Sequence, residues 1–142
     1  MFVKIVENDQ EREYAYTIRK KVFVEEQHVP LEEEIDQYEE DSIHFVLYND
    51  EDHPVGAGRF RIINGIGKVQ RICVLPKARK TGAGAMVMNA IEQYAGSQNI
   101  TQLKLDAQLH AIPFYSKLGY EIISEEFMDA GIAHKTMIKK IS

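Results

Sequence analysis

A glycine-containing loop, Arg79-Lys80-Thr81-Gly82-Ala83-Gly84, is the segment of the sequence whose residue types most clearly allow chemistry. It lies between a strand-like run and a helical run, so its N–H groups and the unpaired N–H groups at the helix start can surround an anion. Lys77, Arg79 and Lys80 add positive charge, which favours a pyrophosphate over a single carboxylate. A helix start with solvated cations would have the same composition, so the loop alone leaves both interpretations open.

Two common nucleotide-binding motifs do not fit this loop. A Walker loop requires Gly-x-x-x-x-Gly-Lys-Ser/Thr, and a dinucleotide fingerprint requires glycine or alanine where Val87 stands. The loop therefore indicates an anion site of another class.

An acidic segment lies earlier in the chain. Between Glu25 and Asp41 there are nine acidic residues and no lysine or arginine. Several carboxylates at the mouth of a cleft would attract a cationic amine and disfavour an anionic substrate. The alternative is an exposed acidic loop that only aids solubility. We interpret the segment as an indication of an amine substrate, either small or peptide-borne.

Removal of a proton from such an amine requires a base. The carboxylates of Glu25, Glu26, Glu33 and Glu34 are candidates, as is His110, because an unperturbed imidazole has a pKa near 6.5. Any single one of these carboxylates is more often a solvated loop charge than a base. The sequence leaves the choice of base open.

Cys73 is the only cysteine and lies between Ile72 and Val74 in a strand-like run. Its thiolate could accept an acyl group in a ping-pong reaction. A cysteine in this setting is more often a small buried hydrophobe, and no histidine adjacent in the sequence would activate it. A single cysteine cannot form an internal disulfide, which fits a reducing compartment, so a cytoplasmic protein is expected.

Composition limits the classes of function. A net charge of −5 argues against a general nucleic-acid binder, and the chain has no apolar run of membrane-spanning or signal-peptide length. The remaining histidines show no metal-ligand spacing, so no metal is expected. Residues 1–142 are expected to form one domain, and a homodimer stays open.

Periodicity predicts the strands and helices that position these residues. Asn8, with Glu11 three residues on, forms a capping box, so a helix is predicted from there to about Val24. Asn64-Gly65 tolerates positive φ at both central positions and predicts a tight hairpin. The predicted strands are Phe2–Val6, His44–Tyr48, Val55–Ile63, Lys68–Leu75, Leu103–Leu105, Tyr120–Phe127 and Ile132–Ile141.

The rest of the predicted structure is helical or irregular. A helix that follows the glycine loop is predicted to end with Gly96 as its C-terminal cap. Pro113 is predicted in the first turn of a short helix through Leu118. Pro30 and the acidic run predict a loop with a short helical turn. The result is a mixed α+β fold with about seven strands and three helices.

These motifs together resemble the GCN5-related N-acetyltransferase (GNAT) family, whose cofactor loop has the form Gln/Arg-x-x-Gly-x-Gly/Ala. The strand Val69–Pro76 and the segment Phe114–Tyr120 fall where the family's pattern places its cofactor strand and its final signature. Val22–Gln27 and Ala107–Ala111, with Glu33-Glu34-Ile35-Asp36, are similar to a bacterial branch of small members. The order of elements agrees over nearly the whole chain.

The resemblance implies a central, mostly antiparallel twisted sheet with helices on both faces. Acetyl-coenzyme A would lie in a V-shaped gap between strands Lys68–Leu75 and Leu103–Ala107, with its pantetheine arm paired to a strand and its pyrophosphate in the loop. A main-chain N–H near the Cys73–Val74 peptide would stabilise the oxyanion. The cofactor-binding residues implied are Ile72, Cys73, Val74, Arg79, Lys80, Thr81, Gly82, Ala83, Gly84, Ala85 and Phe114.

The resemblance also implies that Tyr115 is the general acid beside the cofactor sulfur. A phenol of pKa about 10 protonates a thiolate of pKa about 8.5 only with help from the site. The alternative is that Tyr115 packs with Phe114 as a plain aromatic residue. The expected substrate-binding residues are Glu25, Glu26, Glu33 and His110.

The predicted activity is transfer of an acetyl group from acetyl-coenzyme A to a primary amine of a small molecule or peptide, by direct attack. The alternatives are a non-catalytic acyl-coenzyme A sensor and an acidic protein-interaction domain. Transfer to a hydroxyl, or of an acyl group longer than acetyl, also stays open because loops form the pocket for the acyl acceptor.

Overall fold

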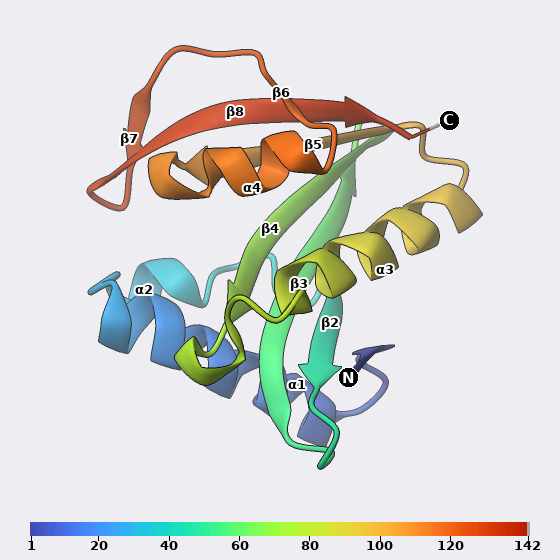
Figure 1. Cartoon of the computed structure of the whole chain (residues 1–142), viewed down its shortest axis with the longest axis vertical. Helices are drawn as coiled ribbons and strands as arrows, with labels where there is room; N and C mark the ends of the chain where they lie inside the picture. The colour runs from blue at the N-terminus through green and yellow to red at the C-terminus, as the bar shows by residue number, and fades with distance from the viewer. Residues whose placement is uncertain (142) are drawn as a thin grey trace.

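A single sheet organises the computed structural model, which describes residues 1–141 (Figure 1). Its order is β1-β2-β3-β4-β5-β8-β6, with β7 also paired to β8, which makes eight strands in the described range. All pairs are antiparallel except β4 and β5. The strands are β1 (Phe2–Ile5), β2 (Ile43–Tyr48), β3 (Pro54–Ile63), β4 (Ile66–Val74), β5 (Gln102–Gln108), β6 (Glu121–Ile122), β7 (Phe127–Asp129) and β8 (Ile132–Lys140).

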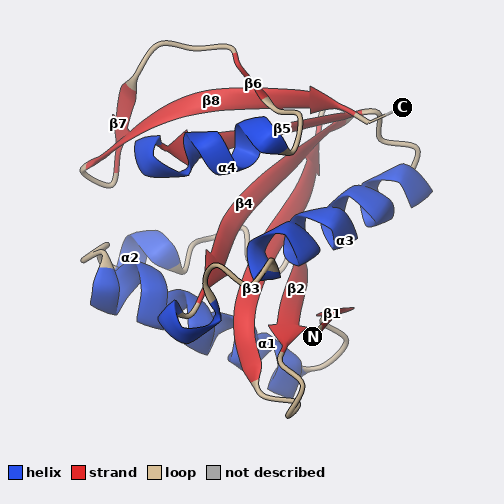
Figure 2. Cartoon of the chain, in the orientation of Figure 1, coloured by secondary structure: helices blue, strands red, loops and turns tan. Residues whose placement is uncertain are grey.

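The helices are shown in blue in Figure 2. Asn8 caps the first one, because its side chain accepts a hydrogen bond from the Glu11 N–H at 2.9 Å, so the predicted helix start is confirmed. Among residues 1–141, no helix combines the length and the apolar character needed to cross a membrane. The helices are α1 (Asp9–Arg19), a π-helix (Lys20–Glu26) that continues it, α2 (Leu31–Glu34), α3 (Ala83–Ser97) and α4 (Ile112–Lys117).

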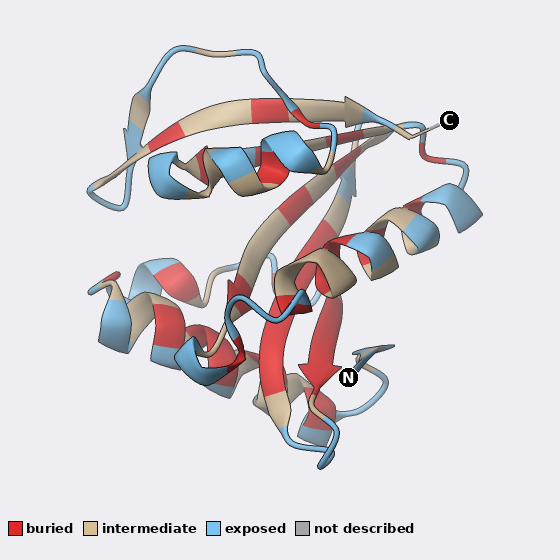
Figure 3. Cartoon of the chain, in the orientation of Figure 1, coloured by how far each residue is buried: buried red, intermediate tan, exposed pale blue. Residues whose placement is uncertain are grey.

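Helices cover both faces of the sheet, as predicted. Because successive side chains in a strand point to opposite faces, Phe45 and Leu47 of β2 pack in the core cluster that contains the apolar residues of α3. Val46 and Tyr48 pack in a second cluster, with those of α1. Buried residues are concentrated on β2 and β3, between the two helices (Figure 3).

Three local predictions can be compared with the structure. The hairpin turn is confirmed, since Asn64 and Gly65 have φ values of 52° and 78°. The helical cap at Gly96 is wrong: α3 continues to Ser97, and Asn99 takes the positive φ, at 60°, after the helix end.

The predicted strand Tyr120–Phe127 is also wrong in part. Its middle does not form a continuous ladder with β8, because the Ser124 hydroxyl accepts the hydrogen bond of the Thr136 N–H at 2.8 Å. This side-chain contact replaces a main-chain carbonyl and separates β6 from β7.

Candidate active site

A cleft opens where β4 and β5 diverge. The two strands pair only at Gly67 with Leu103 and at Lys68 with Lys104. Beyond these pairs they separate (Figure 1), and a cavity of about 880 Å³ lies between them, lined also by the π-helix, α2 and α4. The predicted V-shaped gap is therefore present.

A bulge in β4 shapes one wall of this cleft. Ala57 pairs with Cys73 and Arg59 with Gln70, so β4 uses one residue more than β3 over this stretch. Arg71, within the bulge, has a φ of 60°, which side chains other than glycine seldom adopt.

The main-chain groups after the bulge face the cleft. The Leu75 N–H donates to the Val55 carbonyl at 2.8 Å, so the main-chain groups of Leu75 point toward β3. Because main-chain groups alternate sides along a strand, those of Ile72 and Val74 point away from β3, to the side that β5 has left. They can pair with an extended ligand as an added strand would.

The glycine loop brings N–H groups to one end of the cleft. Lys80 and Gly82 have left-handed φ values of 62° and 86°, which turn the chain sharply into α3. The Met86 N–H donates to the Gly82 carbonyl at 3.1 Å and so begins the helical ladder. The N–H groups of residues 83–85 precede that ladder and are available to an anion.

Helix α4 supplies two aromatic residues to the cleft, Phe114 and Tyr115. A Cβ placed on Gly84 would lie 3.1 Å from the Phe114 ring, so the absence of a side chain lets the two helices approach closely. Tyr115 is 9% exposed, and no hydrogen bond among residues 1–141 uses its hydroxyl. Burial, with a smaller effect from the nearby Cys73 thiol, raises the pKa of Tyr115 well above 10, so the phenol is protonated at neutral pH.

Cys73 lines the same cleft, but its surroundings disfavour the thiolate form. It is 5% exposed, and burial raises the pKa of its thiol to about 12. Since the thiolate is the reactive form, this environment argues against the ping-pong alternative.

A predicted cofactor residue and a predicted substrate residue contact each other. Arg79 Nη1 and Nη2 donate to the two Glu26 carboxylate oxygens at 2.7 and 2.6 Å, and Arg79 Nε donates to the Val74 carbonyl at 3.0 Å. The hydrogen bonds from Arg79 lower the pKa of the Glu26 carboxyl. Glu26 is therefore poorly suited as a general base.

The acidic segment is neutralised in part by arginines from elsewhere in the chain. Glu34 is 2% exposed and lies 2.7 Å from Arg19 Nε and 3.1 Å from Arg71 Nε. Four of the nine carboxylates of this segment form ion pairs, so they add less negative charge to the cleft than the sequence suggests, and Glu34 is not a free base. The paired carboxylates are Glu26, Glu34, Asp36 and Glu39.

Sequence reasoning missed these arginines because they lie outside the acidic segment. Arg19 follows Ile18 on the buried side of α1, and Arg59 lies in a strand of small and apolar residues. An arginine in an otherwise buried pattern is a signal that it has acidic partners.

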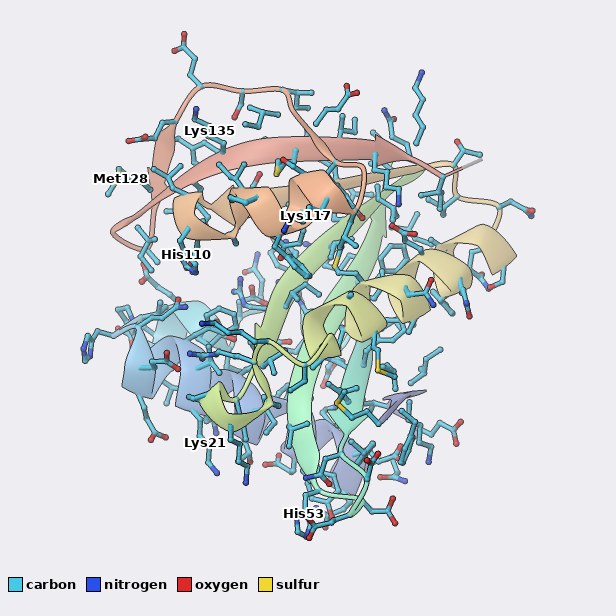
Figure 4. All side chains as sticks on the ribbon, viewed as in Figure 1. Lys21, His53, His110, Lys117, Met128 and Lys135 are labelled. Atoms are coloured by element: carbon cyan, nitrogen blue, oxygen red, sulfur yellow. The ribbon has the colours of Figure 1, made fainter. Side chains whose placement is uncertain are left out.

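The cleft collects most of the predicted residues. His110 lies beneath the N-terminal end of α4, on the side that faces α2 (Figure 4), and both His110 and Glu33 line the cavity. Glu25 is exposed and does not line it. Sequence reasoning gave no signal for a cross-cleft hydrogen bond of 2.8 Å from Gln108 to Gln27. The loop residues outside the cavity lining are Lys80, Thr81, Gly82, Ala83 and Ala85.

Comparison with known proteins gives consistent matches over nearly the whole length of the chain. The Acetyltransferase (GNAT) domain family matches residues 5–141. YjcF of Bacillus subtilis, an uncharacterized N-acetyltransferase, is 48% identical over 136 residues, which cover 95% of this chain and 96% of that protein.

Solved structures share the fold. A candidate N-acetyltransferase from Lactobacillus plantarum has a TM-score of 0.91 with 25% identity and covers 100% of both chains. An aminoglycoside 6′-N-acetyltransferase solved with coenzyme A has a TM-score of 0.80 at 18% identity, covering 100% of this chain and 98% of that one.

Proposed function

The chain belongs to the GNAT acetyltransferase family, and from that premise we propose that it moves an acetyl group from acetyl-coenzyme A to a primary amine of a small molecule or peptide by direct attack. The observation that carries the proposal is the cleft itself. The main-chain groups of Ile72 and Val74, the start of α3 and the Tyr115 side chain all border the opening between β4 and β5.

Binding of the co-substrate follows from these groups. The pantetheine arm would pair with Ile72 and Val74, while the pyrophosphate would lie against the N–H groups of residues 83–85. Phe114 and Gly84 border that position. The coenzyme A in the structurally similar aminoglycoside 6′-N-acetyltransferase supports this use of the fold.

In the proposed reaction, the amine nitrogen forms a bond to the acetyl carbonyl carbon, and the carbonyl electrons move to oxygen. The N–H of Val74, on the cleft side of β4, is the proposed donor to that oxyanion. As the carbonyl re-forms, the carbon–sulfur bond breaks and the thiolate takes the Tyr115 proton. The new amide nitrogen loses a proton, directly to solvent or through a base, and the Tyr115 phenolate regains a proton from solvent. This return of the proton restores the charge balance and the starting form of the enzyme.

The pKa of Tyr115 sets a condition on this step. A phenol with a pKa above its ordinary 10 is a weaker acid than the thiol product, whose pKa in water is about 8.5. A thiolate that forms in the same buried site also has a raised pKa, because burial disfavours the charged form of both groups. The pKa of the thiol in the cleft is therefore closer to that of Tyr115 than the pKa of a thiol in water would be, which favours proton transfer.

On the amine side, Glu33 and His110 are the proposed substrate-binding residues. Both line the cavity, and neither forms a salt bridge among residues 1–141. Glu26 is proposed to contact the amine only after it leaves Arg79. Glu25 drops from the proposal because it lies outside the cavity.

Thermal unfolding with acetyl-coenzyme A, coenzyme A, ATP and NAD tests the proposal first. A ligand at 100 times its dissociation constant adds about 2.7 kcal/mol of stability, so only the two coenzyme A species should raise the unfolding temperature. Acetyl transfer to a panel of primary amines then tests the chemistry. Binding without transfer to any amine would favour the sensor, and the absence of binding at millimolar ligand would overturn the proposal.

A further inference from the structure

A network of six charged side chains lies between α1, α2, β3 and β4. Arg19 and Arg59 are 0% and 1% exposed, and both donate to Glu39, at 2.7 and 3.0 Å. Arg59 also reaches Asp36 at 2.8 Å. With Arg71 and Glu34, the network contains three arginines and three carboxylates, so its formal charges cancel.

Arg71 is the member of this network that reaches the cleft. Its side chain donates to the main-chain carbonyls of Glu33 and Glu34 at 3.1 and 3.3 Å and to Asp36 at 3.2 Å. These partners belong to residues 32–36, here called the α2 wall, four of which line the cavity. Arg71 itself lines the cavity from the β4 bulge.

The backbone of Arg71 is strained in a way that its side-chain contacts explain. A non-glycine residue at a φ of 60° costs about 1–2 kcal/mol relative to ordinary backbone, and it persists when surrounding contacts hold it. Three hydrogen bonds to the α2 wall supply such contacts. The bulge and the wall are thereby fixed to each other through one side chain.

The energetics of buried ion pairs point the same way. A buried ion pair often adds little net stability compared with apolar residues packed in its place. The best-attested role of such a pair is to favour one arrangement of the elements that carry it over other arrangements. The arrangement specified here is the position of the α2 wall relative to the strand proposed to hold acetyl-coenzyme A.

We propose that Arg71 is a positioning residue that fixes the α2 wall, and with it the amine-binding side of the cleft, against β4. The expected change in the KM for the amine rests on the proposed acetyl transfer. The structural consequence of the positioning role, the order of residues 32–36, does not depend on catalysis.

The test compares Arg71→Gly with Arg71→Lys. Glycine adopts a φ of 60° without strain, so Arg71→Gly keeps the bulge and removes the side-chain contacts. Glu34 and Asp36 keep their ion pairs with Arg19 and Arg59, so neither carboxylate is left buried without a partner. We expect the KM for the amine to rise about tenfold or more, with the KM for acetyl-coenzyme A within about twofold of the parent value. Lysine keeps the charge but not the planar fork, so Arg71→Lys should recover part of the loss.

Arg61→Ala is the matched control. Arg61 lies on β3 with its guanidinium 3.7 Å from the Tyr38 ring centroid, and it does not line the cavity. Removal of this arginine should leave both KM values unchanged. An Arg71→Gly enzyme with parental KM for the amine, or with an equal rise in both KM values, would overturn the positioning role.

Hydrogen exchange separates this inference from the proposed function. In Arg71→Gly, the amides of residues 32–36 should exchange at least about tenfold faster than in the parent, while those of α3 should be unchanged. Parental exchange in the α2 wall would overturn the inference even if transfer is normal. Faster exchange in a protein that transfers no acetyl group would uphold it while the proposed function fails.

Discussion

The two sides of the cleft are built by different means. On the proposed cofactor side, the groups offered to the ligand are main-chain N–H and C=O groups of β4 and the main-chain N–H groups at the start of α3, which belong to one segment of the chain. On the opposite side, the α2 wall is held by side chains from α1, β3 and β4 that are distant in sequence.

This difference indicates which side of the cleft tolerates side-chain substitutions. Main-chain groups of a fixed loop present nearly the same surface whatever side chains surround it, provided glycine stays where the backbone needs it. A side-chain network depends on each member, because the loss of one partner leaves another charge buried. We therefore expect mutations of the fully buried members of the network to affect folding, and mutations on the proposed cofactor side to affect ligand binding.

The largest expected effect is on the wall side, in Glu39→Gln. Glu39 accepts hydrogen bonds from Arg19 at 2.8 and 2.7 Å and from Arg59 at 3.0 Å. Without its charge, two buried guanidinium groups lose a partner, which should lower the free energy of unfolding by about 3–5 kcal/mol. Urea unfolding measures this loss. Glu40→Gln, at an exposed neighbour, is the control and should change stability by less than about 0.5 kcal/mol.

The pH dependence of the free energy of unfolding gives a second test of the same carboxylate. Burial alone would raise the pKa of Glu39, but hydrogen bonds and charge from Arg19, with the charge of Arg59, outweigh it and hold the pKa at about 2, below the ordinary 4.5. The carboxylate therefore stabilises the fold fully above pH 4.5, and its contribution is lost as the pH falls toward 2. Unfolding free energies measured across that window should fall more steeply in the parent than in Glu39→Gln. Equal slopes would contradict the pKa assignment.

On the cofactor side, Gly84→Val should remove binding while the fold survives. A Cβ at this position lies 3.1 Å from the Phe114 ring, so the larger valine side chain would crowd the place where the proposed pyrophosphate site meets that ring. The stabilisation of about 2.7 kcal/mol expected from acetyl-coenzyme A at 100 times its dissociation constant should disappear.

Gly96→Val provides the control for that experiment. Gly96 lies in the same helix, and an added Cβ there meets no atom within 4 Å. The ligand-dependent rise in unfolding temperature should be retained. A parental rise in Gly84→Val would show that the start of α3 does not hold the ligand.

The same distinction explains how much could be predicted from the sequence. The hairpin at Asn64-Gly65 and the loop before α3 were predictable because glycine and its neighbours determine local backbone geometry. The break between β6 and β7 was not, because it depends on a hydrogen bond between Ser124 and Thr136, which come from different strands.

The site shows the same division. The proposed cofactor side was inferred from one motif, whereas the α2 wall depends on pairs such as Arg19 with Glu34 and Arg71 with Glu34, separated by 15 and 37 residues. Acidic composition alone could not show that four carboxylates were paired. Buried arginines at residues 19 and 59 were the available signal, and only the fold connects them to their partners.

Tyr115→Phe tests the residue that borders both sides. Removal of the hydroxyl should lower kcat about 100-fold, because general acid catalysis contributes at least that factor, and should leave the acetyl-coenzyme A dissociation constant unchanged. Tyr120→Phe is the control: the ring centroids are 5.9 Å apart, and the Tyr120 hydroxyl is buried without a partner among residues 1–141. It should retain parental kcat. Equal turnover in the two variants would remove the acid role from Tyr115.

Glu26→Gln, the variant with the smallest expected effect, tests the contact between the two sides. The Arg79 guanidinium donates hydrogen bonds both to the Glu26 carboxylate and to the Val74 carbonyl. A bound pantetheine arm would compete with Arg79 for that carbonyl. The ion pair is substantially exposed, so its loss should change the free energy of unfolding by less than about 1 kcal/mol.

A released Arg79 should favour the cofactor. We expect Glu26→Gln to lower the dissociation constant of acetyl-coenzyme A about two- to fourfold, measured by calorimetry, because less than about 1 kcal/mol of pairing no longer opposes binding. Glu25→Gln, which removes an adjacent charge outside the cavity, should leave that constant unchanged. A weaker complex in Glu26→Gln would mean that Glu26 holds Arg79 in its binding position, and the two sides of the cleft would then act together on the cofactor.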